Sequence, residues 1–191
     1  MSCGRMKLPS AGSRRECGRC WSKQRGKGMK KNIWTLAVLL WMCIIFWFSA
    51  KPADESAHMS RSVGHLAGEL LVKDFREWAP EEQDAFAGRI DHFVRKSAHA
   101  AEYAVLGILL GGMYASWSLC GRRHFLLALG SGVLYAATDE FHQLFVPGRS
   151  GQLSDVLLDS GGVLAGTLLY IGAVWLVGRL HKREEKESTV Y

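Results

Sequence analysis

Polar side chains interrupt apolar segments of this sequence at spacings that favour chemistry. His99 and Glu102 are three residues apart, so a helix would place them on one face. Asp155 and Asp159 are four residues apart and would share a face in the same way. Imidazole and carboxylate groups are suited to acid–base catalysis, to binding a divalent metal, or to pairing with a charged ligand.

A third group lies between these two pairs. In the segment Asp139-Glu140-Phe141-His142-Gln143, three polar side chains share one helical face and Glu140 flanks it. Together with nearby basic residues, they predict a polar pocket. Its candidate residues are Arg95, Lys96, His99, Glu102, Tyr103, Asp139, Glu140, His142, Gln143, Arg149, Asp155 and Asp159. The alternative is that these buried acids and bases only hold the helices together.

The pocket residues would be competent for catalysis, but no enzyme signature accompanies them. The His-Glu-xx-His metalloprotease motif is absent, although the set His99, Glu102, Asp139, His142 and Asp155 offers metal-ligand chemistry. Ser97, Ser154 and Ser160 have no nucleophile elbow around them. We therefore assign no catalytic residue, metal or cofactor, and a membrane-embedded hydrolase stays an open alternative.

The elements that must position these residues are apolar blocks of about 20 residues, the length that crosses a bilayer. The predicted spans are residues 32–49, 98–119, 124–146 and 156–178. The sequence thus predicts an all-α, four-helix transmembrane bundle within a membrane domain of residues 32–178. A signal peptide is the alternative for the first block. The glycine pairs 107/111 and 162/166 match the spacing of closely packed membrane helices, and Gly112, Gly130, Gly132 and Gly161 extend these small-residue faces.

The polar connection between the first two spans is predicted to contain amphipathic interfacial helices. Pro80-Glu81-Glu82 is a typical helix start, followed by apolar residues at helical spacing. A second such helix is expected within 56–75.

The acids within the spans are predicted to lie near the outer edge of the membrane. At 1.5 Å per residue, Glu102 and Asp139 would lie roughly 8 Å inside that edge and Asp159 about 6 Å. Charges at that depth are costly, so we expect them to face one another.

Lysine and arginine set the predicted orientation. The segment 1–31 holds ten of them against one acid, and Arg122, Arg123 and the 179–191 tail fall on the same side, whereas Arg149 stands alone in the short loop opposite. Both termini are therefore expected in the cytoplasm of a bacterial cell, with a multi-pass chain in its membrane.

The first 31 residues are expected to be a disordered basic arm beside the membrane. A nucleic-acid-binding role is not expected, because a basic segment next to a span has this simpler explanation. Cys17 and Cys20 have half of a zinc-site spacing, with no second pair. Met29-Lys30-Lys31 resembles a bacterial start, so residues 1–28 are expected not to be translated in the native protein.

The ordered motifs resemble those of the VanZ-like family. They are Arg95-Lys96-xx-His99-xx-Glu102-Tyr103, then the 139–143 segment, Pro147-Gly148-Arg149 and Asp155-xxx-Asp159, with Phe48-Ser49-Ala50-Lys51-Pro52 after the first span. The resemblance covers about 34–178. It implies a membrane protein of the type linked to low-level resistance to the glycopeptide teicoplanin, without a defined reaction.

Three functions fit these observations. The first is recognition of an envelope precursor, an anionic lipid headgroup or a glycopeptide-related ligand at the outer face, with basic residues meeting phosphate or carboxylate. The second is the hydrolase. The third is transport along the buried acids, which would require a homo-oligomer because four spans carry no internal repeat. The lipid bilayer is the partner common to all three.

Overall fold

The computed structural model describes residues 27–187, and these form an all-helical chain, which confirms the all-α part of the predicted fold class. The helices are α2 (Lys27–Ser49), α3 (Ala53–Leu71), the short 3-10 helix η1 (Phe75–Glu77), α4 (Pro80–Ser116), α5 (Gly121–Gln143) and α6 (Leu153–Glu187). Cys17, Cys20 and the greater part of the expected basic arm lie outside the described residues.

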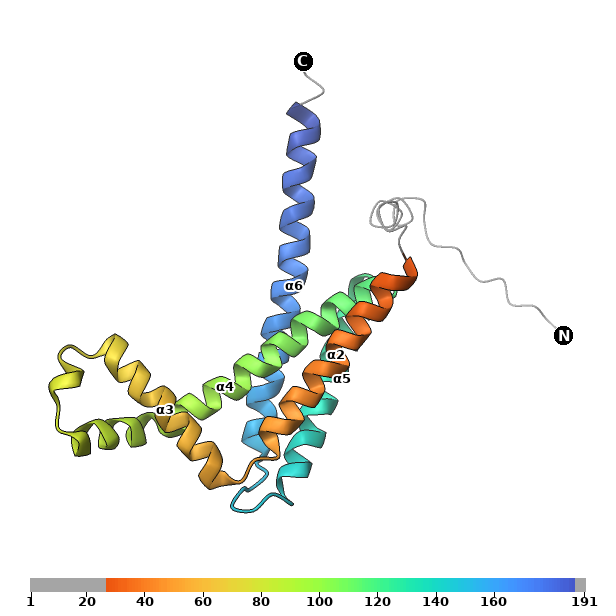
Figure 1. The fold of residues 1–191 in the computed structure, drawn as a ribbon. Helices are drawn as coiled ribbons and strands as arrows, with labels where there is room; N and C mark the ends of the chain where they lie inside the picture. The colour runs from red at the N-terminus through yellow and green to blue at the C-terminus, as the bar shows by residue number, and fades with distance from the viewer. Residues whose placement is uncertain (1–26, 188–191) are drawn as a thin grey trace.

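Helices α2, α5, the second half of α4 and the first half of α6 pack together, the rest of α6 extends beyond them, and one hairpin projects from the other end (Figure 1). We call α2, the second half of α4, α5 and α6 the bundle. The arm is the hairpin of α3, η1 and residues 80–94 of α4. The chain runs alternately along the bundle, so α2 and α5 end, and α6 begins, at the end from which the arm projects.

Helix boundaries differ from the predicted spans where local backbone chemistry was overlooked. α4 begins at Pro80 as expected but ends at Ser116, and the turn occupies 117–120, earlier than predicted. Ser118 and Gly121 have positive φ values of 70° and 61°, which end one helix and admit the next. At the chain ends, α2 already includes residues 27–31, and α6 continues to Glu187 through the predicted tail.

Within residues 27–187, two helices are long and apolar enough to cross a membrane: Lys31–Ser49 within α2 and Leu153–His181 within α6. α4 and α5 do not meet this test, because polar, glycine and tyrosine residues interrupt their apolar runs. Helix length and composition therefore support two membrane helices, and the four-span arrangement does not follow from them.

The glycines of α4 and α6 allow these two helices to touch through their backbones. A Cβ atom on Gly166 would lie 1.8 Å from the carbonyl oxygen of Ala104, and one on Gly107 would lie 2.3 Å from that of Val163. Such contacts exclude any larger residue. Gly130 and Gly161, which were assigned to the same small-residue faces, have nothing within 4 Å.

At the end of the bundle opposite the arm, aromatic and histidine side chains close the core. His124 forms a 2.8 Å hydrogen bond to the carbonyl oxygen of Gly111, and Tyr170 lies edge-on to Trp34. Between the two ends, Tyr135 donates a 2.6 Å hydrogen bond to the carbonyl oxygen of Met42. These contacts fix α2, α4, α5 and α6 relative to one another and so position the side chains at the other end.

The arm buries small residues and exposes large ones. Gly64 of α3 packs against Ala87 of α4, and Phe75 closes the tip beneath Trp78 and Phe86. On the outer side of α3, an apolar stripe formed by Met59, Val63, Leu66 and Leu70 is 38–75% exposed. In a protein surrounded by water this arrangement would be inverted, whereas a helix lying on a membrane presents its apolar face in this way.

Candidate functional site

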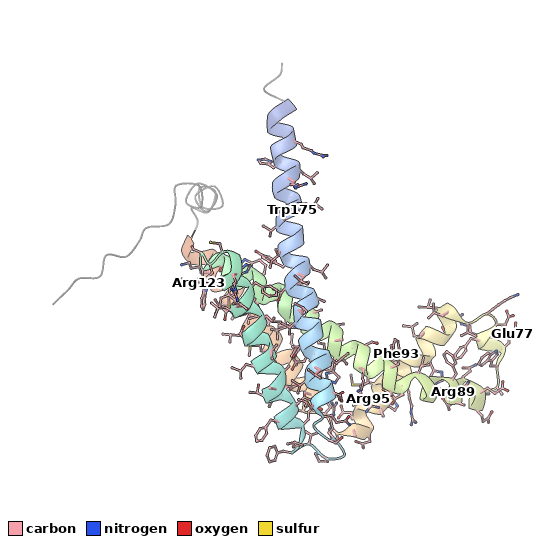
Figure 2. The ribbon with its side chains drawn as sticks, turned by 180° about the vertical axis from the view of Figure 1, so that it is seen from behind. Glu77, Arg89, Phe93, Arg95, Arg123 and Trp175 are labelled. Carbon is pink, nitrogen blue, oxygen red and sulfur yellow. The ribbon has the colours of Figure 1, made fainter. Side chains whose placement is uncertain are left out.

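The predicted pocket residues gather where the arm joins the bundle. A backbone hydrogen bond of 3.2 Å from Ala53 to Pro147 ties the start of α3 to the loop between α5 and α6. Figure 2 shows Arg95 at this junction, with Arg123 at the opposite end of the bundle. The spacing of the polar residues along three separate helices therefore does bring them to one level.

A polar cavity of about 150 Å³ opens at the junction. It lies between α4, the end of α5, the α5–α6 loop and the start of α6. The lining residues are Ala53, His92, Arg95, Lys96, His99, Glu140, Gln143, Gly148, Arg149, Ser150, Gln152, Asp155, Leu158 and Asp159. Positively charged, negatively charged and amide side chains thus line one small cavity.

A second cavity of about 120 Å³ lies between the end of α2, α3 and α4. Its apolar wall consists of Phe48, Met59, Val63, Val94 and Ala98. Its other lining residues are Lys51, Ser56, Ser60, Glu102 and the three that also line the polar cavity, Arg95, His99 and Arg149. A polar and a largely apolar space therefore meet at one shared wall.

Two of the three predicted cations have carboxylate partners. Lys96 forms a 2.7 Å ion pair with Asp155 of α6, and Arg95 pairs with Asp91 one turn earlier on its own helix. Both pairs are half-buried; the Lys96–Asp155 pair links α4 to α6, whereas the Arg95–Asp91 pair lies within α4. Asp155 of α6 is therefore connected to α4 through Lys96.

Arg149 differs from the other cations. Its Nε donates a 3.1 Å hydrogen bond to the carbonyl oxygen of Lys51, and it forms no ion pair with any carboxylate in the part of the chain described. Burial lowers the pKa of Arg149 from its ordinary value, and the Arg95 guanidinium lowers it further, against the opposite effect of nearby acids. A half-buried guanidinium in this state is suited to receiving an anion.

The acids lie deeper than the bases. Asp139 is 3% exposed, and the side chains of Ser49, Tyr103 and Gln143 lie around its carboxyl. Glu140 is also buried, and its Oε2 accepts a 3.0 Å hydrogen bond from the backbone N–H of Gln152. Asp159 is 1% exposed, and neither of its carboxyl oxygens has a hydrogen-bond partner within residues 27–187, an unfavourable state for a buried carboxyl that a ligand could relieve.

The remaining predicted residues differ in their surroundings. His99 Nδ1 lies 3.9 Å from Glu102 Oε2, too far for a hydrogen bond. Tyr103 is fully buried beside Tyr135, and its hydroxyl has no partner among the described residues. His142 lines neither cavity, because its ring packs 4.5 Å from that of Phe46. Gln143 Nε2 donates a 3.0 Å hydrogen bond to Ser49 Oγ.

Metal binding has no geometric support in the region from 27 to 187. No three His, Cys, Asp or Glu side chains of that region are grouped as they would be around an ion. His99 and Glu102, at 3.9 Å, are also too far apart to form a hydrogen-bonded acid–base pair. What the arrangement does offer is an open cationic group above buried, unpaired acids, which is a binding arrangement for a charged ligand.

Sequence reasoning missed residues that complete the wall. Ser49 is fully buried against Gln143, Asp91 holds Arg95, and Gln152 caps Glu140 through its backbone. Ser49 belongs to the motif Phe48-Ser49-Ala50-Lys51-Pro52, in which nothing marks it as a pocket residue. Asp91 stands four residues before Arg95, the spacing of a helical ion pair, so it could have been found.

Comparison with known proteins bears on the whole chain. No significant match was found among curated proteins, and none among solved structures. A family model described as VanZ/LLP1 matches residues 34–177, which include every predicted pocket residue. The chain therefore belongs to the VanZ-like family.

Proposed function

We propose that this VanZ-like protein binds the anionic headgroup of a membrane amphiphile in the polar cavity. The single observation that carries the proposal is Arg149, which faces both cavities and has no carboxylate partner within the described chain. A guanidinium in this position binds phosphate or carboxylate through paired N–H donors. Arg95 and Lys96 add positive charge on the same wall.

The neighbouring apolar cavity favours an amphiphile over a free anion. A headgroup held at Arg149 can extend its chain between Met59, Val63 and Phe48 towards the exposed stripe of α3. An envelope precursor on a lipid carrier and a phospholipid both have this chemistry. A role in teicoplanin-type resistance would follow if the amphiphile belongs to the pathway that the antibiotic blocks.

The proposal includes a topology. We place α2, the second half of α4, α5 and α6 across a bacterial cytoplasmic membrane, with both termini inside and the arm at the outer surface. Arg122 and Arg123 then lie inside and Arg149 outside, in agreement with the distribution of positive charge in short loops. The polar residues of α4 and α5 face the cavities and each other, which lowers the cost of placing them in lipid.

Lipid binding by an Arg149→Gln variant tests the proposal. We expect the full chain in detergent to bind phosphatidylglycerol, measured by native mass spectrometry, and the variant to bind it at least about tenfold more weakly, because a charge-assisted pair is lost. Arg61→Gln is the matched control, since Arg61 is exposed on α3 and lines neither cavity. Equal binding by Arg149→Gln and the wild type would overturn the proposal.

A further inference from the structure

We infer that the bound amphiphile carries a primary ammonium group beside its anionic group, and that the Asp159 carboxylate receives this ammonium. The inference rests on the proposed function, because it assigns the second half of the same ligand. It predicts a zwitterionic headgroup of the phosphoethanolamine type or an amino-acyl equivalent.

The first support is the state of Asp159 itself. Its side chain lines the polar cavity, is 1% exposed, and has two carboxyl oxygens without a hydrogen-bond partner in the described chain. Native proteins rarely leave a buried polar group in this condition. A donor group from a ligand would satisfy both oxygens at once.

The second support is the charge around Asp159. Besides burial, the groups that act on it are the carboxyls of Glu140, Asp139, Asp155 and Glu102. Among the cations that line the same cavity, Lys96 pairs with Asp155 and Arg95 with Asp91, and Arg149 forms no ion pair with Asp159. Acids from α4, α5 and α6 therefore act on Asp159, and no cation within residues 27–187 forms an ion pair with it.

The polar cavity carries groups of both charges. Its lining includes the Arg149 guanidinium, which has no carboxylate partner in residues 27–187, and the Asp159 carboxyl, which has no hydrogen-bond partner there. A headgroup with both charges a few bonds apart matches this lining better than a simple anion does.

The lining identifies the kind of cation. A primary ammonium has three N–H donors, enough for the orphan oxygens of Asp159 and a neighbouring carboxyl. A quaternary ammonium has none and is usually held by aromatic rings. The cavity lining contains no Phe, Tyr or Trp, so it is built for N–H donation and not for a methylated ammonium. A metal ion would require a cluster of ligands that residues 27–187 do not form.

The experiment compares headgroups on identical acyl chains. The full chain is titrated by native mass spectrometry with phosphatidylethanolamine, its mono- and dimethyl derivatives, phosphatidylcholine and phosphatidylglycerol. We expect affinity to fall with each methyl group, to at least tenfold below phosphatidylethanolamine for phosphatidylcholine. Equal affinity for phosphatidylethanolamine and phosphatidylcholine would overturn the inference, and this comparison needs no variant.

Two variants separate the inference from the proposed function. Asp159→Asn should bind phosphatidylethanolamine and phosphatidylcholine equally, and Asp54→Asn, an exposed acid outside both cavities, should retain the wild-type preference. A persistent preference in Asp159→Asn would refute the assigned residue. If instead Arg149→Gln leaves the binding of every lipid unchanged, the proposed anion site is wrong, whatever Asp159 does.

Discussion

Lys96 on α4 and Asp155 on α6 form a 2.7 Å ion pair although 59 residues separate them in the sequence. Both residues belong to the lining of the polar cavity. The pair therefore joins the helix that leaves the bundle for the arm to the helix that starts beside Arg149.

This ion pair should contribute measurably to stability. A double-mutant cycle with Lys96→Ala and Asp155→Ala, followed by unfolding in detergent, should give a coupling free energy of about 1 kcal/mol, because both side chains are partly shielded from water. The Arg76–Glu69 pair at the arm tip is the control. Arg76 is far more exposed, so its coupling should be smaller. A coupling no larger than that of the control pair would contradict the prediction.

Substitution at Gly166 should separate α4 from α6. A valine there would place Cβ against the carbonyl oxygen of Ala104, so we expect a loss of about 3 kcal/mol or more and a melting temperature lower by about 5 °C or more. Gly161→Val is the matched control on the same helix, since a Cβ at Gly161 meets nothing within 4 Å. Similar melting of the two variants would show that the helices do not pack this closely.

The exposed stripe of α3 should lie in the lipid interface. In a chain with its five cysteines replaced by serine, Leu70→Cys carrying an environment-sensitive fluorophore should show blue-shifted emission and quenching by lipids labelled near the headgroup. Arg61→Cys, on the polar side of the same helix, should show neither effect. Water-like emission from the Leu70 site would place the stripe away from the membrane.

Reporter fusions test the proposed topology. Fusions after Pro52, Gly121, Gly148 and Tyr191 should report outside, inside, outside and inside, because the positive charge of short loops sets orientation. The fusion after Gly148 is decisive, since it follows α5. A cytoplasmic signal at that position would exclude the four-span arrangement and place Arg149 on the wrong side for an outer-leaflet ligand.

The sequence predicted the helical fold because apolar runs and the Pro80 helix start are local signals. The polar spacing on three segments also predicted a shared pocket, and Arg95, Lys96, His99, Glu140, Gln143, Arg149, Asp155 and Asp159 all line the polar cavity; the predicted depth in the membrane stays a prediction. The sequence did not predict that α4 continues without a break from the arm into the bundle. The amphipathic first part and the apolar second part of this helix have different sequence patterns, and nothing in the sequence shows that one helix contains both.

The division of roles within the pocket was beyond sequence reasoning for another reason. Arg95, Lys96 and Arg149 look equivalent as basic residues, and only packing shows that the first two are paired and the third is not. Likewise, helical spacing put His142 on the face of Asp139, but the position of Phe46 draws its ring towards α2. Contacts between segments that are distant in the sequence determine which cation is paired and where the His142 ring lies, and residue spacing carries no information about those contacts.

The continuity of α4 has a consequence for how the arm is set. One helix of 37 residues carries both the arm and the pocket wall, so the rotational phase between them is counted in residues, at about 100° each. One alanine inserted after Phe93 would swing α3 a quarter-turn around the bundle, against the hydrogen bond from Ala53 to Pro147. Four inserted alanines would restore the phase to within about 40° but move the arm about 6 Å along the helix axis. The direction in which α3 faces and the position of the cavity wall beside Arg149 are therefore both set by the number of residues in α4.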